Sequence, residues 1–118
     1  MNTTEIAQDM VELNKQGRFV EAGEKYWAED VLSVEAGGDN PVSRGKEAAH
    51  AKGEWWANAF EVNNLVIEGP YVNGDQFAVR FKLDTTEKAS GQRSTMDEVG
   101  IYTVKDGKIA EERFFNGG

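Results

Sequence analysis

The sequence predicts an α+β fold, in which a cone-shaped, curved antiparallel or mixed sheet wraps around three N-terminal helices. Apolar residues keep helical spacing in most of residues 1–60, and the pattern then changes to strand-like alternation up to the end of the chain. Two hairpin signals, Asn73-Gly74 and Asp106-Gly107, divide this second part into an antiparallel meander. Since the 118 residues contain no repeat, linker or low-complexity segment, we expect residues 1–118 to form one domain.

The first two helices follow from capping residues and apolar spacing. Either Thr3 or Thr4 can cap a helix that runs to about Lys15, and Gly17 ends it. A second helix is expected over about residues 19–27.

A strand, a loop and a third helix complete the first half. The β-branched segment from Val31 to Ala36 predicts a short strand. The next segment, GGDNPVSRG at residues 37–45, is predicted to be a loop, because it is rich in turn-forming residues. The third helix is expected from Lys46 to Phe60, with one apolar stripe formed by Ala49, Gly53, Trp56 and Phe60.

The second half predicts four strands, at Glu61–Val72, Gln76–Thr86, Gln92–Val104 and Lys108–Asn116. The first of them should break or bend at Gly69-Pro70. A long, twisted meander with helices against one face curls into a half-barrel, and the helices close its mouth. The wide end of such a cone is hard to fill with side chains, so it predicts a small-molecule pocket.

Composition excludes several classes of function. Lys and Arg total 13 against 21 Asp and Glu, which argues against nucleic acid and anionic membranes as partners. The absence of cysteine excludes disulfides and thiolate metal sites. Neither a signal peptide nor a membrane helix is expected, so the predicted location is the cytoplasm. No acidic run has calcium-loop spacing, and neither a metal nor a cofactor is expected.

The stretch KIAEERFF, residues 108–115, places two acids side by side in a predicted strand. Successive strand side chains point to opposite faces of a sheet. If both faces of this strand are covered, one of the two acids, Glu111 or Glu112, must point into the protein.

Four segments carry a family resemblance: YWAEDVLSVEAG, SRGKEAAHAKGEWW, NGDQFAVRFKL and EVGIYTVKDGKIAEERFF. They resemble SnoaL-like members of the nuclear transport factor-like superfamily, which also includes ketosteroid isomerase, scytalone dehydratase and the polyketide cyclases. The resemblance spans essentially the whole chain. It implies the cone-shaped fold and a homodimer packed through the convex face of the sheet, with Arg80, Arg113, Tyr71 and Phe115 at or near the interface.

The resemblance also implies which positions face the pocket. Glu35 falls where ketosteroid isomerase has its catalytic base, and Glu112 falls on the inward face of the last strand. In the strand before it, Glu98 and Tyr102 should also point inward. The oxyanion-donating acid of the isomerase is replaced by Gly100, or by Val99 in another alignment, and the first helix supplies no tyrosine. Authentic steroid isomerase activity is therefore not expected.

The predicted chemistry is acid/base catalysis. Burial and neighbouring carboxylates raise a carboxyl pKa, so Glu35 could act as a general base. Glu98 or Glu112 would be the acid or hydrogen-bond donor, and Tyr102 the second donor. The ligand, a small apolar molecule, should contact Ser33, Trp27, Trp56, Phe60, Phe77, Val79, Phe81 and Phe114.

Other interpretations compete with this one. A glutamate on a strand of an acidic protein is usually solvated, and His50, the only histidine, is expected to be exposed. The function predicted first is an enzyme for isomerisation, cyclisation or dehydration of a small apolar carbonyl compound. The alternatives are a non-catalytic ligand-binding module and a structural homodimer whose cone is filled.

Overall fold

Three helices and six strands make up the residues that the structure describes, 1–38 and 41–116, in a computed structural model. Their order is α1 (Thr3–Lys15), α2 (Phe19–Tyr26), β1 (Trp27–Val34), β2 (Val42–Arg44), α3 (Lys46–Ala59), β3 (Phe60–Asn73), β4 (Gln76–Glu87), β5 (Arg93–Lys105) and β6 (Lys108–Asn116). None of these helices is long and apolar enough to cross a membrane, within the described residues.

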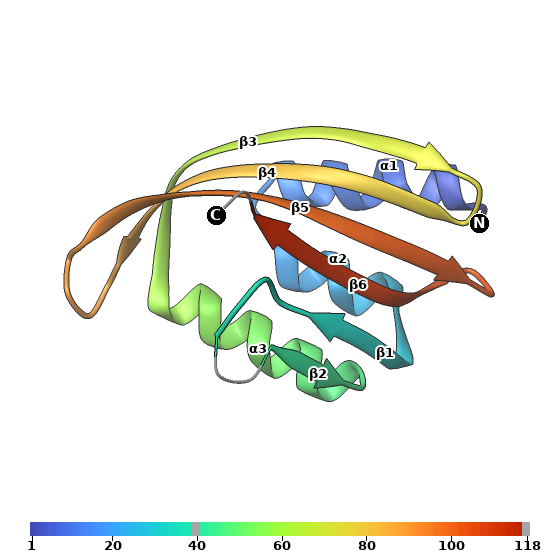
Figure 1. The fold of residues 1–118 in the computed structure, drawn as a ribbon, viewed down its shortest axis with the longest axis horizontal. Helices are drawn as coiled ribbons and strands as arrows, with labels where there is room; N and C mark the ends of the chain where they lie inside the picture. The colour runs from blue at the N-terminus through green and yellow to red at the C-terminus, as the bar shows by residue number, and fades with distance from the viewer. Residues whose placement is uncertain (39–40, 117–118) are drawn as a thin grey trace.

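The six strands form one sheet in the order β2-β1-β6-β5-β4-β3. All neighbouring pairs are antiparallel except β1 and β6, which run parallel, so the sheet is mixed. Figure 1 shows the long strands β3, β4 and β5 arching over the helices, while β1 and β2 lie beside α3. The predicted α+β fold is confirmed, with a curved sheet that does not close into a barrel.

The helices pack against the concave face of this sheet. α1 contacts β3 and β4, α3 contacts β1, and α2 lies between the other two helices. Alternation along β4 turns Phe77, Val79, Phe81 and Leu83 toward them, and all four side chains are buried. The strand bend expected at Gly69-Pro70 is present as a shift in the β3–β4 register between Glu68 and Tyr71.

Two boundaries differ from the sequence prediction at the junction of α2 and β1. The helix ends at Tyr26, and the strand begins at Trp27 rather than at Val31. Trp27 has an extended backbone, and the register between β1 and β6 is irregular from Trp27 to Leu32. The helical spacing of apolar residues continues to Trp27, which explains the error in the predicted boundary. In the structure Trp27 belongs to β1, and its indole donates a hydrogen bond to Glu112 of β6.

Two smaller predictions were also wrong. The first helix is capped by Asn2 instead of Thr3 or Thr4, because Asn2 and Glu5 exchange side-chain and backbone hydrogen bonds in a capping box. The predicted loop contains strand β2, whose three residues pair with the edge of β1. Residues 39 and 40 of that loop lie outside the described residues.

Candidate functional site

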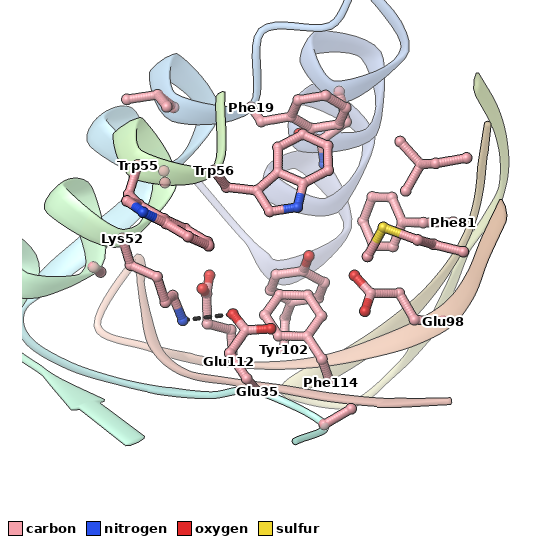
Figure 2. A pocket seen from close by; sticks show the side chains of 18 of the residues that line it. Phe19, Glu35, Lys52, Trp55, Trp56, Phe81, Glu98, Tyr102, Glu112 and Phe114 are labelled. Carbon is pink, nitrogen blue, oxygen red and sulfur yellow. Dashed lines mark ion pairs between the residues drawn. The ribbon is translucent and has the colours of Figure 1, made fainter. Parts of the chain in front are cut away.

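A cavity of about 400 Å³ lies between the concave face of the sheet and the helices. Apolar and aromatic side chains form most of its wall, and Glu35, Glu98, Glu112, Tyr102 and Lys52 are the ionisable groups that line it within the described residues. Figure 2 shows these five side chains converging below the indole of Trp56.

Pairing of the strands explains why the polar groups meet. Ser33 on β1 is the direct neighbour of Glu112 on β6, and Glu112 is the neighbour of Tyr102 on β5. One step nearer the open end, Gly100 pairs with Phe114. A Cβ atom at Gly100 would come within 2.9 Å of the Phe114 ring, so the missing side chain makes room for that ring.

Glu112 is buried, with 6% of its surface exposed, and both of its carboxyl oxygens accept hydrogen bonds. Trp27 Nε1 donates to Oε1 over 2.7 Å, and Ser33 Oγ donates to Oε2 over 2.7 Å. Burial raises the pKa of Glu112, while these two hydrogen bonds oppose the rise. Each of its carboxyl oxygens therefore accepts one hydrogen bond from the protein.

Lys52 contacts both Ser33, the hydrogen-bond partner of Glu112, and Glu35. Its Nζ lies 2.5 Å from Ser33 Oγ and 2.7 Å from Glu35 Oε1. Glu35 follows the last residue of β1, and its backbone N–H donates to the carbonyl of Pro41. The carboxylate that the sequence assigns as the base is therefore in an ion pair with Lys52.

Glu98 is the carboxyl of the cavity that has no hydrogen-bond or ion-pair partner in the described part of the chain. It is partly buried between its strand neighbours Phe81 and Asn116. Burial, and then the charge of Glu35, raise the pKa of Glu98 from 4.5 to about 7, although Lys52 acts in the opposite direction.

Tyr102 lies between aromatic rings at the bottom of the cavity. Its ring stacks on Phe77 with centroids 4.8 Å apart and meets Phe114 edge-on at 6.0 Å. Burial and the nearby carboxylates, Glu112 first, raise the pKa of the Tyr102 hydroxyl well above its usual value. The hydroxyl therefore stays protonated near neutral pH and can serve as a hydrogen-bond donor.

The structure brings most of the predicted site residues together. The cavity is lined by Glu35, Glu98, Glu112, Tyr102, Trp27, Trp56, Phe81 and Phe114. Four other predicted ligand contacts are not part of its wall: Ser33, Phe60, Phe77 and Val79. Ser33 lies behind Glu112, Phe60 stacks on the outer side of Trp56, and Phe77 and Val79 are core residues in the filled end of the cone.

Sequence reasoning missed Lys52 altogether. The residue lies among Ala49, Gly53 and Trp56 on the face of α3 that lines the cavity, so its position within an apolar stripe was the available signal. His50, which was expected to be exposed, is half-buried, with ring nitrogens 2.5 Å from Glu24 and 2.9 Å from Glu54. No cluster of three or more metal-binding side chains is present among the described residues.

Comparison with known families identifies the fold. A family model described as the SnoaL-like domain matches residues 1–116. The chain belongs to the SnoaL-like domain family. Among curated proteins, none matches this SnoaL-like domain.

Several solved structures are similar to this SnoaL-like domain. A protein from Mesorhizobium loti, provisionally named a SnoaL-like polyketide cyclase, is 59% identical with a TM-score of 0.92, over 98% of this chain and 99% of that one. A protein of the same provisional name from Jannaschia is 23% identical with a TM-score of 0.74, over 95% and 88% of the two chains. An NTF2-like protein of unknown function from Burkholderia pseudomallei is 16% identical with a TM-score of 0.79, over 98% and 91%.

Proposed function

We propose that the protein is an enzyme that transfers a proton on a small, mostly apolar carbonyl compound without a cofactor. The observation that carries the proposal is Glu98, a carboxyl that faces the cavity, has no hydrogen-bond or ion-pair partner among the described residues, and has a pKa raised to about 7. A general base is most effective when its pKa lies near the working pH. Isomerisation, aldol cyclisation and dehydration all begin with this kind of proton transfer.

In the proposed step, the Glu98 carboxylate takes a proton from the carbon next to the substrate carbonyl. The electrons of the broken C–H bond form an enolate, whose negative charge gathers on the carbonyl oxygen. The Tyr102 hydroxyl, kept neutral by its raised pKa, donates a hydrogen bond to that oxygen. Glu98 then returns the proton to another carbon, or the enolate carbon attacks a second carbonyl to close a ring and Glu98 gives its proton to the alkoxide that forms.

The base is assigned to Glu98 rather than to Glu35. The ion pair with Lys52 occupies the Glu35 carboxylate, and leaving that pair would cost the protein a charged contact of 2.7 Å. Glu98 has no such contact to break in the part of the chain that the structure describes. The aromatic wall formed by Trp56, Phe81 and Phe114 supports an apolar substrate and excludes water from the enolate.

The test measures proton exchange, because it requires no knowledge of the final product. The protein is incubated in D₂O with a panel of enolisable cyclic ketones, and proton NMR follows the loss of signal at the carbon next to the carbonyl. Glu98→Gln should slow the exchange by at least about a hundredfold, and Tyr102→Phe should slow it by about ten- to a hundredfold. The wild-type rate should rise with pH up to about 7 and then level off, since the base must be ionised.

The matched control is Glu111→Gln, because Glu111 neighbours Glu112 in sequence but lies on the convex face, 3.6 Å from Arg113. The Glu111→Gln variant should catalyse proton exchange of the ketones at the wild-type rate. If the ketones bind to the protein but their protons exchange no faster than in buffer alone, the enzyme proposal is overturned and the ligand-binding alternative is supported. Exchange that survives Glu98→Gln would overturn the assignment of the base.

A further inference from the structure

Lys52 is the basic side chain of a cavity that three carboxyl groups line, among the described residues. Figure 2 shows it entering from α3, on the side opposite Glu98, with its ammonium directed at Glu35. Its side chain is only 24% exposed, so the charge is held inside the site rather than in free solvent.

The contacts of Lys52 fix the direction of the hydrogen bond between Ser33 and Glu112. An ammonium group can only donate, so the 2.5 Å contact uses a lone pair of the Ser33 oxygen. Ser33 is fully buried, and its one hydroxyl proton is then directed to Glu112 Oε2. With Trp27 donating to the other oxygen, Glu112 is surrounded by donors on both sides.

We propose that Lys52 is a positioning residue that gives the three carboxyl groups of the cavity different roles. It binds Glu35 directly and holds Glu112 through Ser33, and so leaves Glu98 as the carboxyl that can exchange a proton. This inference rests on the proposed function, since it explains how Glu98 becomes the base.

The charges around Glu98 support this division. Glu35 follows β1, Lys52 comes from α3, Glu112 from β6 and Tyr102 from β5 itself, while α1, α2 and β4 contribute no titratable side chain to the cavity. Lys52 lowers the pKa of both Glu98 and Glu112, and Glu35 raises both. Removal of the ammonium group should therefore raise the pKa of both Glu98 and Glu112.

The experiment follows the titration of Glu98 and Glu112 by carbon NMR of protein labelled at the glutamate carboxyl carbons. In Lys52→Met both titration midpoints should rise, whereas in Glu35→Gln both should fall. Lys52→Arg keeps the charge and should keep the wild-type midpoints. In the exchange assay, Lys52→Met should lose activity and shift the pH profile upward.

The matched control is Lys46→Met. Lys46 is also on α3 and also 24% exposed, but its contact is with Glu24, 3.7 Å away and outside the cavity. It should leave both midpoints unchanged. Equal effects of Lys46→Met and Lys52→Met would show a general charge effect and overturn the proposal.

Ser33→Ala tests whether Lys52 acts through Ser33 and keeps the proposal testable if Lys52→Met folds poorly. Ser33→Ala should raise the Glu112 midpoint by itself, since it removes one of two donors. It should also reduce the further effect of Lys52→Met, whereas additive effects would overturn the proposal. These titrations need no substrate, so their failure can be distinguished from a failure of the exchange assay.

Discussion

Glu98 has its raised pKa only in the folded protein, because unfolding exposes the same carboxyl to water. Between pH 4.5 and about 7 the folded protein therefore binds more protons at this side chain than the unfolded chain does. The free energy of unfolding falls as the pH rises through this window, and above it the loss of stability caused by Glu98 is complete and no longer changes with pH. A pKa shift of this size corresponds to about 3 kcal/mol at most, so the proposed base reduces the stability of the fold.

Glu98→Gln should consequently be more stable than the wild type at about pH 8, by up to about 3 kcal/mol, and nearly equal to it at about pH 4. Urea denaturation at several pH values measures the difference directly. The gain should grow up to about pH 7 and then remain constant. A difference that does not vary with pH would mean that Glu98 titrates in the folded protein as it does in the unfolded chain.

Single residues also show what the sequence could and could not predict. Period-two alternation required Glu111 and Glu112 to lie on opposite faces, and the family resemblance indicated that Glu112 is the one on the concave face. Alternation cannot say how far along the cone a side chain lies, so Phe77 and Val79 were predicted as ligand contacts although they fill the core. Lys52 was missed because a lysine side chain on a helix usually reaches solvent, and only the packed structure shows its contacts.

Helix α2 illustrates how one element is shaped by the site. Gly23 lies against the indole of Trp27, and a Cβ atom there would come within 2.3 Å of the ring. Gly23→Ala should therefore destabilise the protein by about 1–3 kcal/mol, although alanine is the better helix former. The displaced indole would also lose its hydrogen bond to Glu112. Thermal unfolding measures the first effect, and the Glu112 titration measures the second.

Gly53→Ala is the matched control, because Gly53 is also a helical glycine that lines the cavity. The nearest atom to its added Cβ would be a Val20 methyl carbon at 3.4 Å. This variant should be neutral or slightly more stable than the wild type. A loss as large as that of Gly23→Ala would refute the packing explanation.

Elements with strong local signals were predicted closely, and those that depend on a distant partner were not. Asp106-Gly107 forms the turn between β5 and β6, with positive φ at both residues. The turn between β3 and β4 is Gly74-Asp75, one residue later than the predicted Asn73-Gly74, and Gly74 provides its positive φ. β2 escaped prediction, since its residues Val42–Arg44 become a strand only by pairing with β1.

For the whole molecule, the fold could be predicted because the pattern of helices and strands and the family resemblance agree over the full length. The open volume of the cone could not be predicted from the sequence, because it depends on how Trp56, Phe81 and Phe114 pack together. The homodimer stays a prediction. Arg80, expected at its interface, is engaged by Asp97 in the same chain.

Tyr71 and Phe115 are 65% and 51% exposed on the convex face, which supports an interface there. Sedimentation equilibrium at micromolar concentration should give twice the mass of one chain. Phe115→Asp should reduce it to that of one chain, because it would bury a charge in the interface. A wild-type protein that sediments as a monomer would contradict the prediction.

The position of β6 has a consequence for synthesis in the cell. This strand is made last of the six, yet it lies between β1 and β5 in the sheet. Until it has left the ribosome, the nascent chain has β2-β1 on one side and β5-β4-β3 on the other, with nothing to pair between them. Glu112 arrives with that strand, so the sheet and the candidate site should be completed together, once β6 has left the ribosome.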